Sequence, residues 1–118
     1  MIERLKSVRF SLRGIWVLIS TEASIKVQLV VTIIAVVLGI YFNISVTEWL
    51  IQSLMIAIVL VAESLNTGIE KLSDFVQSEY DEQIKLVKDI SAGAVGIAAI
   101  FALLIGGIIY LPKIALLF

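Results

Sequence analysis

Three long apolar stretches dominate the chain, and short polar segments separate them. The first, residues 27–42, is apolar except for Gln28 and Thr32. The second and third follow a turn at residues 43–45 and a polar connection at residues 78–82. Because a helix rises about 1.5 Å per residue, each stretch can cross a hydrocarbon layer about 30 Å thick. The pattern predicts three transmembrane helices, over about 24–42, 46–77 and 84–111.

Local signals predict where these helices begin and end. Ser20 or Thr21 is suited to cap the first span, because a hydroxyl accepts a hydrogen bond from a free backbone N–H. Trp49 is suited to anchor the second span at the membrane interface. Pro112 is expected to end the third span at Leu111, because proline lacks the backbone N–H that a helix needs.

Residues 2–19 show a different pattern, in which apolar side chains recur every three or four residues. The basic side chains lie largely off this stripe: Arg4, Lys6, Arg9 and Arg13. The spacing predicts an amphipathic helix that lies in the headgroup layer of an anionic membrane surface. The alternative is a helix that packs against the rest of the protein. We expect the whole chain, 1–118, to form one membrane domain.

Composition supports an all-α integral membrane protein. The chain is 60% hydrophobic and has a mean hydropathy of +1.08. A soluble domain of 118 residues could not bury so much apolar surface. The chain has no cysteine and no histidine, which excludes thiolate and imidazole chemistry. A net charge of −1 favours no nucleic-acid partner.

Basic residues are concentrated on one side of the predicted spans. With three spans, the N-terminus and the connection around residues 71–89 face the same side. All nine lysines and arginines lie there except Lys113. An excess of lysine and arginine marks cytoplasmic segments. We therefore expect a multi-pass plasma-membrane protein whose N-terminus and polar connection are cytoplasmic.

One polar face stands out at the cytoplasmic end of the second span. Its side chains recur at helical intervals: Glu63, Asn66, Thr67, Glu70 and Asp74. Glu63 lies about 26 Å along the helix from the start of the span, near the edge of the hydrocarbon. Ionisable residues at that depth are rare, and they typically mark functional sites.

Carboxylates and a lysine at a membrane interface are suited to phosphoryl transfer. Magnesium typically takes one or two carboxylates together with phosphate oxygens. Lys88 can offset phosphate charge, and a partly dehydrated Glu63 is a stronger general base. Asp74 has a structural alternative, either an ion pair with Lys71 or a turn cap. No common nucleotide-binding motif is present, so the spacing alone indicates a cation-dependent membrane site, with a lipid-acting enzyme as one option.

A different class of protein, a small non-enzymatic subunit of a cation-coupled transporter, would also contain intramembrane acids. Such a protein places its acids near the bilayer midplane, facing a pore. Here the acids cluster at one edge of the membrane beside a lysine. That placement favours the enzyme.

Two motifs resemble the signature of the prokaryotic diacylglycerol kinase family. They are Glu63-x-x-Asn66-Thr67-x-x-Glu70 with Asp74, and Lys88-Asp89-x-x-Ala92-Gly93-Ala94-Val95. The resemblance covers essentially the whole chain, including a glutamate, Glu22, before the first span. It implies a homotrimer whose active sites are shared between protomers. It also implies transfer of the γ-phosphate of MgATP to a lipid hydroxyl.

The resemblance also implies roles for individual residues. Glu63 would be the general base, and Asn66 would orient Glu63 or the lipid acceptor. Glu22 and Glu70 would bind Mg²⁺. The nucleotide would contact Phe10, Glu79, Tyr80, Asp81, Lys88 and Asp89. The lipid substrate would contact Glu63, Arg9 and Ser91. Asp81 stands where the family often has histidine, and Phe10 stands where a tyrosine can occur.

The resemblance leaves two lipid substrates open. Diacylglycerol would give phosphatidic acid, and undecaprenol would give undecaprenyl phosphate. Two segments are more similar to the undecaprenol-using branch: Ile44-Ser45-Val46-x-x-Trp49 and Tyr110-Leu111-Pro112-Lys113. Both lipids present an alcohol at the same membrane depth.

Overall fold

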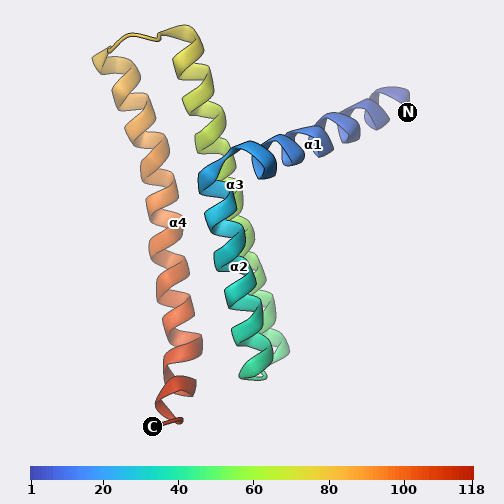
Figure 1. The fold of residues 1–118 in the computed structure, drawn as a ribbon, viewed down its shortest axis with the longest axis vertical. Helices are drawn as coiled ribbons and strands as arrows, with labels where there is room; N and C mark the ends of the chain where they lie inside the picture. The colour runs from blue at the N-terminus through green and yellow to red at the C-terminus, as the bar shows by residue number, and fades with distance from the viewer.

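The computed structural model describes residues 1–118 and consists of four helices joined by short connections. Helices α2, α3 and α4 lie side by side, and α1 projects away from them (Figure 1). The helices span Ile2–Thr21 (α1), Ala23–Tyr41 (α2), Val46–Val76 (α3) and Glu82–Ala115 (α4). Helices α2 to α4 are each long and apolar enough to cross a membrane. The predicted all-helical fold, with three helices that fit membrane spans, is confirmed.

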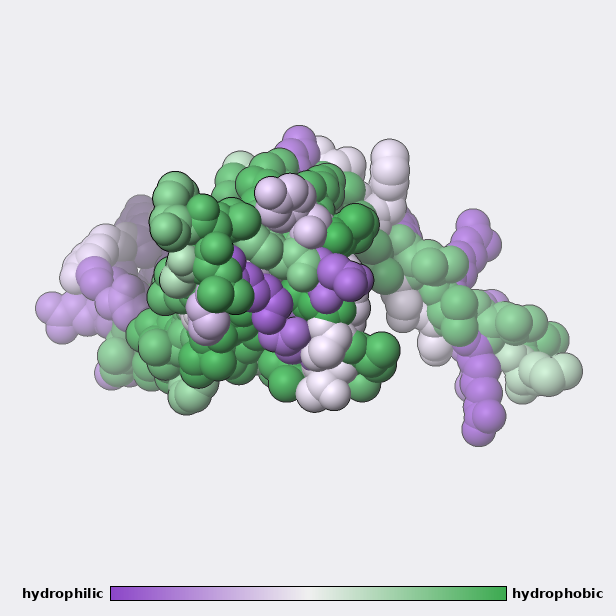
Figure 2. Space-filling model, turned by 90° about the horizontal axis from the view of Figure 1, so that it is seen from below, coloured by the Kyte–Doolittle hydropathy of each residue, from purple (hydrophilic) through white to green (hydrophobic).

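Most apolar side chains face outward. Only 11 of the 118 residues are buried, and none of them lies in α1. Hydrophobic residues cover most of the bundle when it is viewed from the end where α2 and α3 meet (Figure 2). Exposed apolar surface of this extent is unfavourable in water, but it matches the hydrocarbon of a bilayer. The helices meanwhile satisfy their backbone groups internally, as a membrane requires.

Side-chain caps begin two of the membrane helices. At the start of α3, the Glu48 N–H donates to Ser45 Oγ at 3.1 Å, and the Ser45 N–H donates to Glu48 Oε1 at 3.0 Å. At the start of α4, Asp81 Oδ1 accepts hydrogen bonds from the backbone N–H groups of Gln83 and Ile84. These caps satisfy N–H groups that would otherwise lack partners.

The caps predicted for α2 do not form. The hydroxyls of Ser20 and Thr21 donate to the carbonyls of Trp16 and Val17 within α1, at 2.7 and 2.6 Å. Both residues belong to α1, and the residue between the two helices is Glu22, with an extended backbone. Glu22 therefore forms the joint from which α1 turns away from the bundle.

Pro112 does not end α4, and the prediction that the helix stops at Leu111 is wrong. The helix continues to Ala115. Pro112 lies close to the end of the helix, where losing one N–H disturbs few backbone hydrogen bonds. Lys113 also holds this part of the helix, because its Nζ donates to Glu48 Oε2 at the start of α3, at 2.9 Å.

A small core closes the end where α2 meets α3. It contains Ile44, Ile109 and Tyr110. Gly39 allows α2 to pass closely, because a Cβ on this residue would lie 2.6 Å from Trp49 Cη2. Asn43 makes the turn with a φ of 52°, a left-handed conformation that asparagine tolerates.

Candidate active site

The residues of the two motifs lie toward the opposite end of the bundle. There α2 begins, α3 ends, and residues 77–81 connect α3 to α4 (Figure 1). Glu63, Asn66 and Glu70 follow one another along α3, so one helix face carries all three. The predicted polar face is therefore formed by a continuous helix.

Asn66 is held by Glu70 and retains an unused acceptor. The Asn66 side-chain N–H donates to Glu70 Oε1 at 3.1 Å. Asn66 Oδ1 is buried and has no hydrogen-bond partner. Burying an acceptor without a donor is unfavourable, so such an atom calls for an explanation. Glu63 lies one turn earlier on α3 and is half-buried.

Glu22 contacts α3 through a lysine. Lys71 Nζ lies 3.0 Å from Glu22 Oε1. The Glu22 side chain is 23% exposed, whereas the Lys71 side chain is 65% exposed. Lys71 directly follows Glu70, so this ion pair brings Glu22 to the turn of α3 that carries Glu70.

Two further ion pairs lie at the start of α4. Lys88 Nζ donates to Asp74 Oδ1 and so joins α4 to α3. Lys85 Nζ donates to Asp89 Oδ2 at 2.6 Å within α4. Of the two structural alternatives for Asp74, the pair with Lys71 is wrong, because each of these two residues has another partner.

The connection between α3 and α4 borders a small polar cavity. Its volume is about 290 Å³, and it is lined by Gln77, Ser78, Glu79, Tyr80, Asp81, Ile84, Lys85 and Lys88. Four of the predicted nucleotide residues therefore share one cavity. Asp81 also caps α4 through one carboxylate oxygen, which positions the cavity wall.

The single chain does not bring all predicted residues together. Arg9 and Phe10 are exposed on α1, which projects away from the bundle (Figure 1). Ser91 is buried within α4. These three residues remain predictions for the substrate contacts.

The carboxylates suit a magnesium ion that also binds phosphate. The structure contains no cluster of three or more Asp or Glu residues that could hold a metal by itself. Glu70 and Glu22 each contact one neighbouring side chain, and a carboxylate has about four acceptor sites. Magnesium bound to a nucleotide needs only one or two protein carboxylates. The carboxylates of Glu22 and Glu70 therefore fit a magnesium ion that is bound to a nucleotide.

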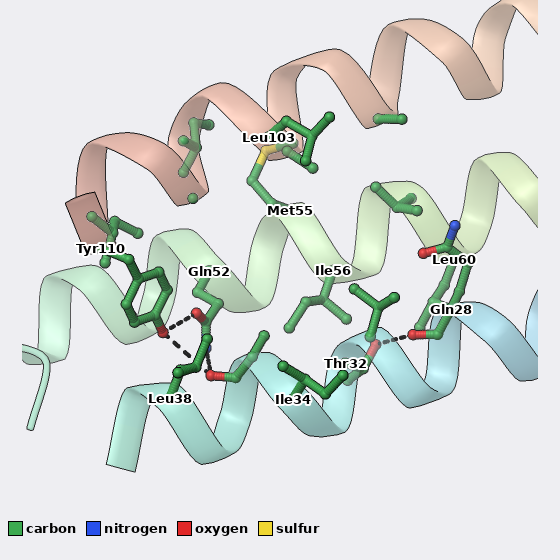
Figure 3. Close-up of a pocket in the computed structure, with 18 residues that line it drawn as sticks. Gln28, Thr32, Ile34, Leu38, Gln52, Met55, Ile56, Leu60, Leu103 and Tyr110 are labelled. Atoms are coloured by element: carbon green, nitrogen blue, oxygen red, sulfur yellow. Dashed lines mark hydrogen bonds between the residues drawn. The ribbon is translucent and has the colours of Figure 1, made fainter. Parts of the chain in front are cut away.

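The structure also contains a polar cluster that the sequence analysis missed. Tyr110 donates its hydroxyl to Gln52 Oε1, and Gln52 Nε2 donates to the Ala35 carbonyl at 3.3 Å (Figure 3). The cluster lies at one end of a largely apolar cavity of about 480 Å³ between the three spans. Gln52, a polar residue inside an apolar span, was the available signal.

The chain is similar in sequence to known proteins over most of its length. Residues 9–110 match the sequence profile of the family described as Prokaryotic diacylglycerol kinase. The undecaprenol kinase of Bacillus subtilis is 33% identical over 102 residues, covering 86% of this chain and 83% of that protein. The diacylglycerol kinase of Escherichia coli K12 is 28% identical over 100 residues, covering 85% and 82%. That of Synechocystis is 28% identical over 111 residues, covering 93% and 63%.

Proposed function

The chain belongs to the prokaryotic diacylglycerol kinase family and is a lipid kinase, and we propose that it transfers the γ-phosphate of ATP to a membrane alcohol at the cytoplasmic interface. The observation that supports this site best is the buried, unpartnered Asn66 Oδ1. A lipid hydroxyl is a donor that would satisfy it. The same hydroxyl would then lie near Glu63, one turn away on α3.

Glu63 is the proposed general base. The single O–H proton of the lipid first donates to Asn66 Oδ1, and the O–H then turns toward Glu63, which accepts the proton as the hydroxyl oxygen attacks the γ-phosphorus. The bond between that phosphorus and the β–γ bridging oxygen breaks, and ADP leaves with the bond's electron pair. Asn66 orients the hydroxyl through Oδ1, while its N–H group holds Glu70. Positioning of this kind is the main contribution a protein makes to phosphoryl transfer.

Glu22 and Glu70 are the proposed ligands of the Mg²⁺ that accompanies ATP. When bound, this ion offsets charge on the phosphate oxygens. Lys88 acts on the phosphates as well, and Asp74 holds its side chain in place. The cavity beside residues 77–81 holds the nucleotide through Glu79, Tyr80 and Asp81. Asp89 bonds to Lys85, which lines the same cavity. Phe10 completes the nucleotide contacts, and Arg9 and Ser91 contact the lipid.

The proposed assembly is a homotrimer whose sites combine residues of neighbouring protomers. The position of α1 supports this, because the helix that carries Arg9 and Phe10 projects away from the bundle of the single chain (Figure 1). A neighbouring chain would supply what is missing. The concentration of lysine and arginine on this side supports a cytoplasmic site in the plasma membrane.

Undecaprenol is the first candidate for the lipid. The undecaprenol kinase shares 33% identity with this chain, whereas the diacylglycerol kinases share 28%. The test is a competition assay, in which protein in mixed micelles receives labelled ATP, Mg²⁺ and equal amounts of undecaprenol and diacylglycerol. We expect most of the label on undecaprenol. Label on diacylglycerol alone would reverse the assignment, and label on neither lipid would refute the proposed kinase reaction.

Replacing Glu63 tests the general base. We expect Glu63→Gln to lower the rate of phosphoryl transfer by about 100- to 10,000-fold, because an amide cannot accept the proton. Circular dichroism and size-exclusion chromatography in detergent should show an unchanged fold and assembly. Retained activity in a correctly folded variant would contradict the role of Glu63.

A further inference from the structure

Glu22 makes a single ion pair, with Lys71. The local structure around Glu22 does not require this pair. Glu22 occupies the joint between α1 and α2, with an extended backbone at φ −96° and ψ 116°. Its side chain accepts no hydrogen bond from the first turn of α2, so it does not cap that helix. The only ion pair or hydrogen bond that joins this carboxylate to α3 is the one with Lys71.

A nearer lysine is available but does not pair with Glu22. Lys26 lies one helical turn further along α2, at the spacing that favours an ion pair on a helix surface. The structure nevertheless places Glu22 against Lys71, 49 positions away on a different helix. The long-range pair therefore reflects the packing of the α1–α2 joint against α3, and not a local helix preference.

The two proposed metal ligands are held in the same manner. Glu70 Oε1 accepts a hydrogen bond from Asn66 at 3.1 Å, and Glu22 Oε1 lies 3.0 Å from Lys71 Nζ. No other side chain in the chain bonds to either carboxylate. Each group thus has one oxygen restrained, and acceptor capacity remains for a cation.

We infer that Lys71 is a positioning residue, which holds Glu22 beside Glu70 so that both carboxylates can bind one divalent cation. This inference rests on the proposed role of Glu22 and Glu70 as metal ligands. Partners that orient metal-binding carboxylates contribute strongly to metal affinity. The positive charge of Lys71 opposes a cation only weakly, because its side chain is 65% exposed and solvent screens it.

The test measures binding of Mn²⁺, which takes the oxygen ligands of Mg²⁺ and has an electron paramagnetic resonance signal. The full chain in detergent micelles is titrated with Mn²⁺ in the presence of a non-hydrolysable ATP analogue, because the proposed ligands bind the ion together with phosphate oxygens. We expect Lys71→Met to weaken Mn²⁺ binding by about tenfold. Lys71→Arg should restore most of the affinity, since arginine can hold the same carboxylate. Lys26→Met is the matched control, which removes the same charge near Glu22 without removing an ion pair, and should leave the affinity unchanged.

The Glu22→Gln background separates orientation from general stability. There, adding Lys71→Met should change Mn²⁺ affinity no further, because the carboxylate that Lys71 positions is already gone. Unchanged or tighter Mn²⁺ binding by Lys71→Met would overturn the inference, as would an equal loss in Lys26→Met. If either of these results is obtained while the wild-type chain phosphorylates lipid, only the proposed role of Lys71 is refuted. If the wild-type chain phosphorylates no lipid, the proposed function fails instead.

Discussion

The two ends of the bundle use polar side chains in opposite ways. At the end where α2 meets α3, the polar groups of Gln52, Tyr110 and Glu48 are bonded to other parts of the chain. At the other end, Asn66 has a buried oxygen without a partner. The Lys85–Asp89 and Lys71–Glu22 pairs there include side chains more than half exposed.

This difference separates stability from function. Polar groups that bond to other parts of the chain hold helices together and keep less capacity for a ligand. Groups with free acceptors or exposed charges contribute little to stability, yet they can bind a cation, a phosphate or a hydroxyl. We therefore expect substitutions at the end where α2 meets α3 to change stability, and substitutions at the proposed active site to change activity.

The largest contrast is expected between two glutamates of α3. Glu70→Gln should lower lipid phosphorylation by at least about 100-fold. Removing a residue that only orients a metal ligand already lowers activity by about 10- to 100-fold, and Glu70 is itself a proposed ligand. Glu48→Gln should keep activity, because it removes only the ion pair with Lys113, and glutamine can still accept the hydrogen bond from the Ser45 N–H. The assay is incorporation of labelled phosphate at saturating Mg²⁺. Similar losses in the two variants would contradict the division between the ends.

Gly39→Ala should give the largest loss of stability among small substitutions. The new Cβ would lie 2.6 Å from Trp49 Cη2 and 3.1 Å from Ile44 Cδ1, so the packing of α2 against α3 must shift. We expect a loss of about 1–3 kcal/mol in the free energy of unfolding. Unfolding in detergent, followed by circular dichroism, measures it.

Gly107→Ala is the matched control for that substitution. A Cβ there meets only Leu111 Cδ1, at an ordinary 3.7 Å. Its stability should be close to that of the unmodified chain. Equal effects in the two variants would show that Gly39 is not needed for the close packing.

Tyr110→Phe should have a smaller effect on stability. It removes the hydroxyl that donates to Gln52 Oε1 and leaves Gln52 with its bond to the Ala35 carbonyl. Hydrogen bonds between membrane helices contribute about 0.6 kcal/mol on average, with a maximum near 1.7 kcal/mol. Unfolding should therefore shift slightly, with the KM for ATP unchanged. A marked rise in that KM would show that the two ends are coupled.

Much of the fold follows from the sequence because hydrocarbon imposes simple rules. Long apolar stretches must form helices in a membrane, and the predicted spans agree with α2, α3 and α4 to within a few residues at most boundaries. Pro112 was the exception. The rule that proline ends a helix failed here because Pro112 lies only three residues before the end of α4, and because the neighbouring Lys113 is bonded to Glu48.

The shared helix face of the proposed site was predictable from the sequence, and its side-chain contacts were not. Helical spacing alone placed Glu63, Asn66 and Glu70 on one face, since those positions depend only on the geometry of one helix. The sequence suggested Lys71 as an ion-pair partner for Asp74, whereas the structure pairs Asp74 with Lys88 across two helices. Such a pair depends on how α3 packs against α4.

The sequence by itself determined the helices, the membrane spans and the motifs of the family, because each depends on local composition and on helical periodicity. The tertiary structure decided which charges meet. It directed Glu22 to Lys71 and not to Lys26, and it joined Gln52 to Tyr110. The physical reason is that side chains distant in sequence come within bonding distance only after the helices have packed, and many partners are compatible with the same sequence pattern until then.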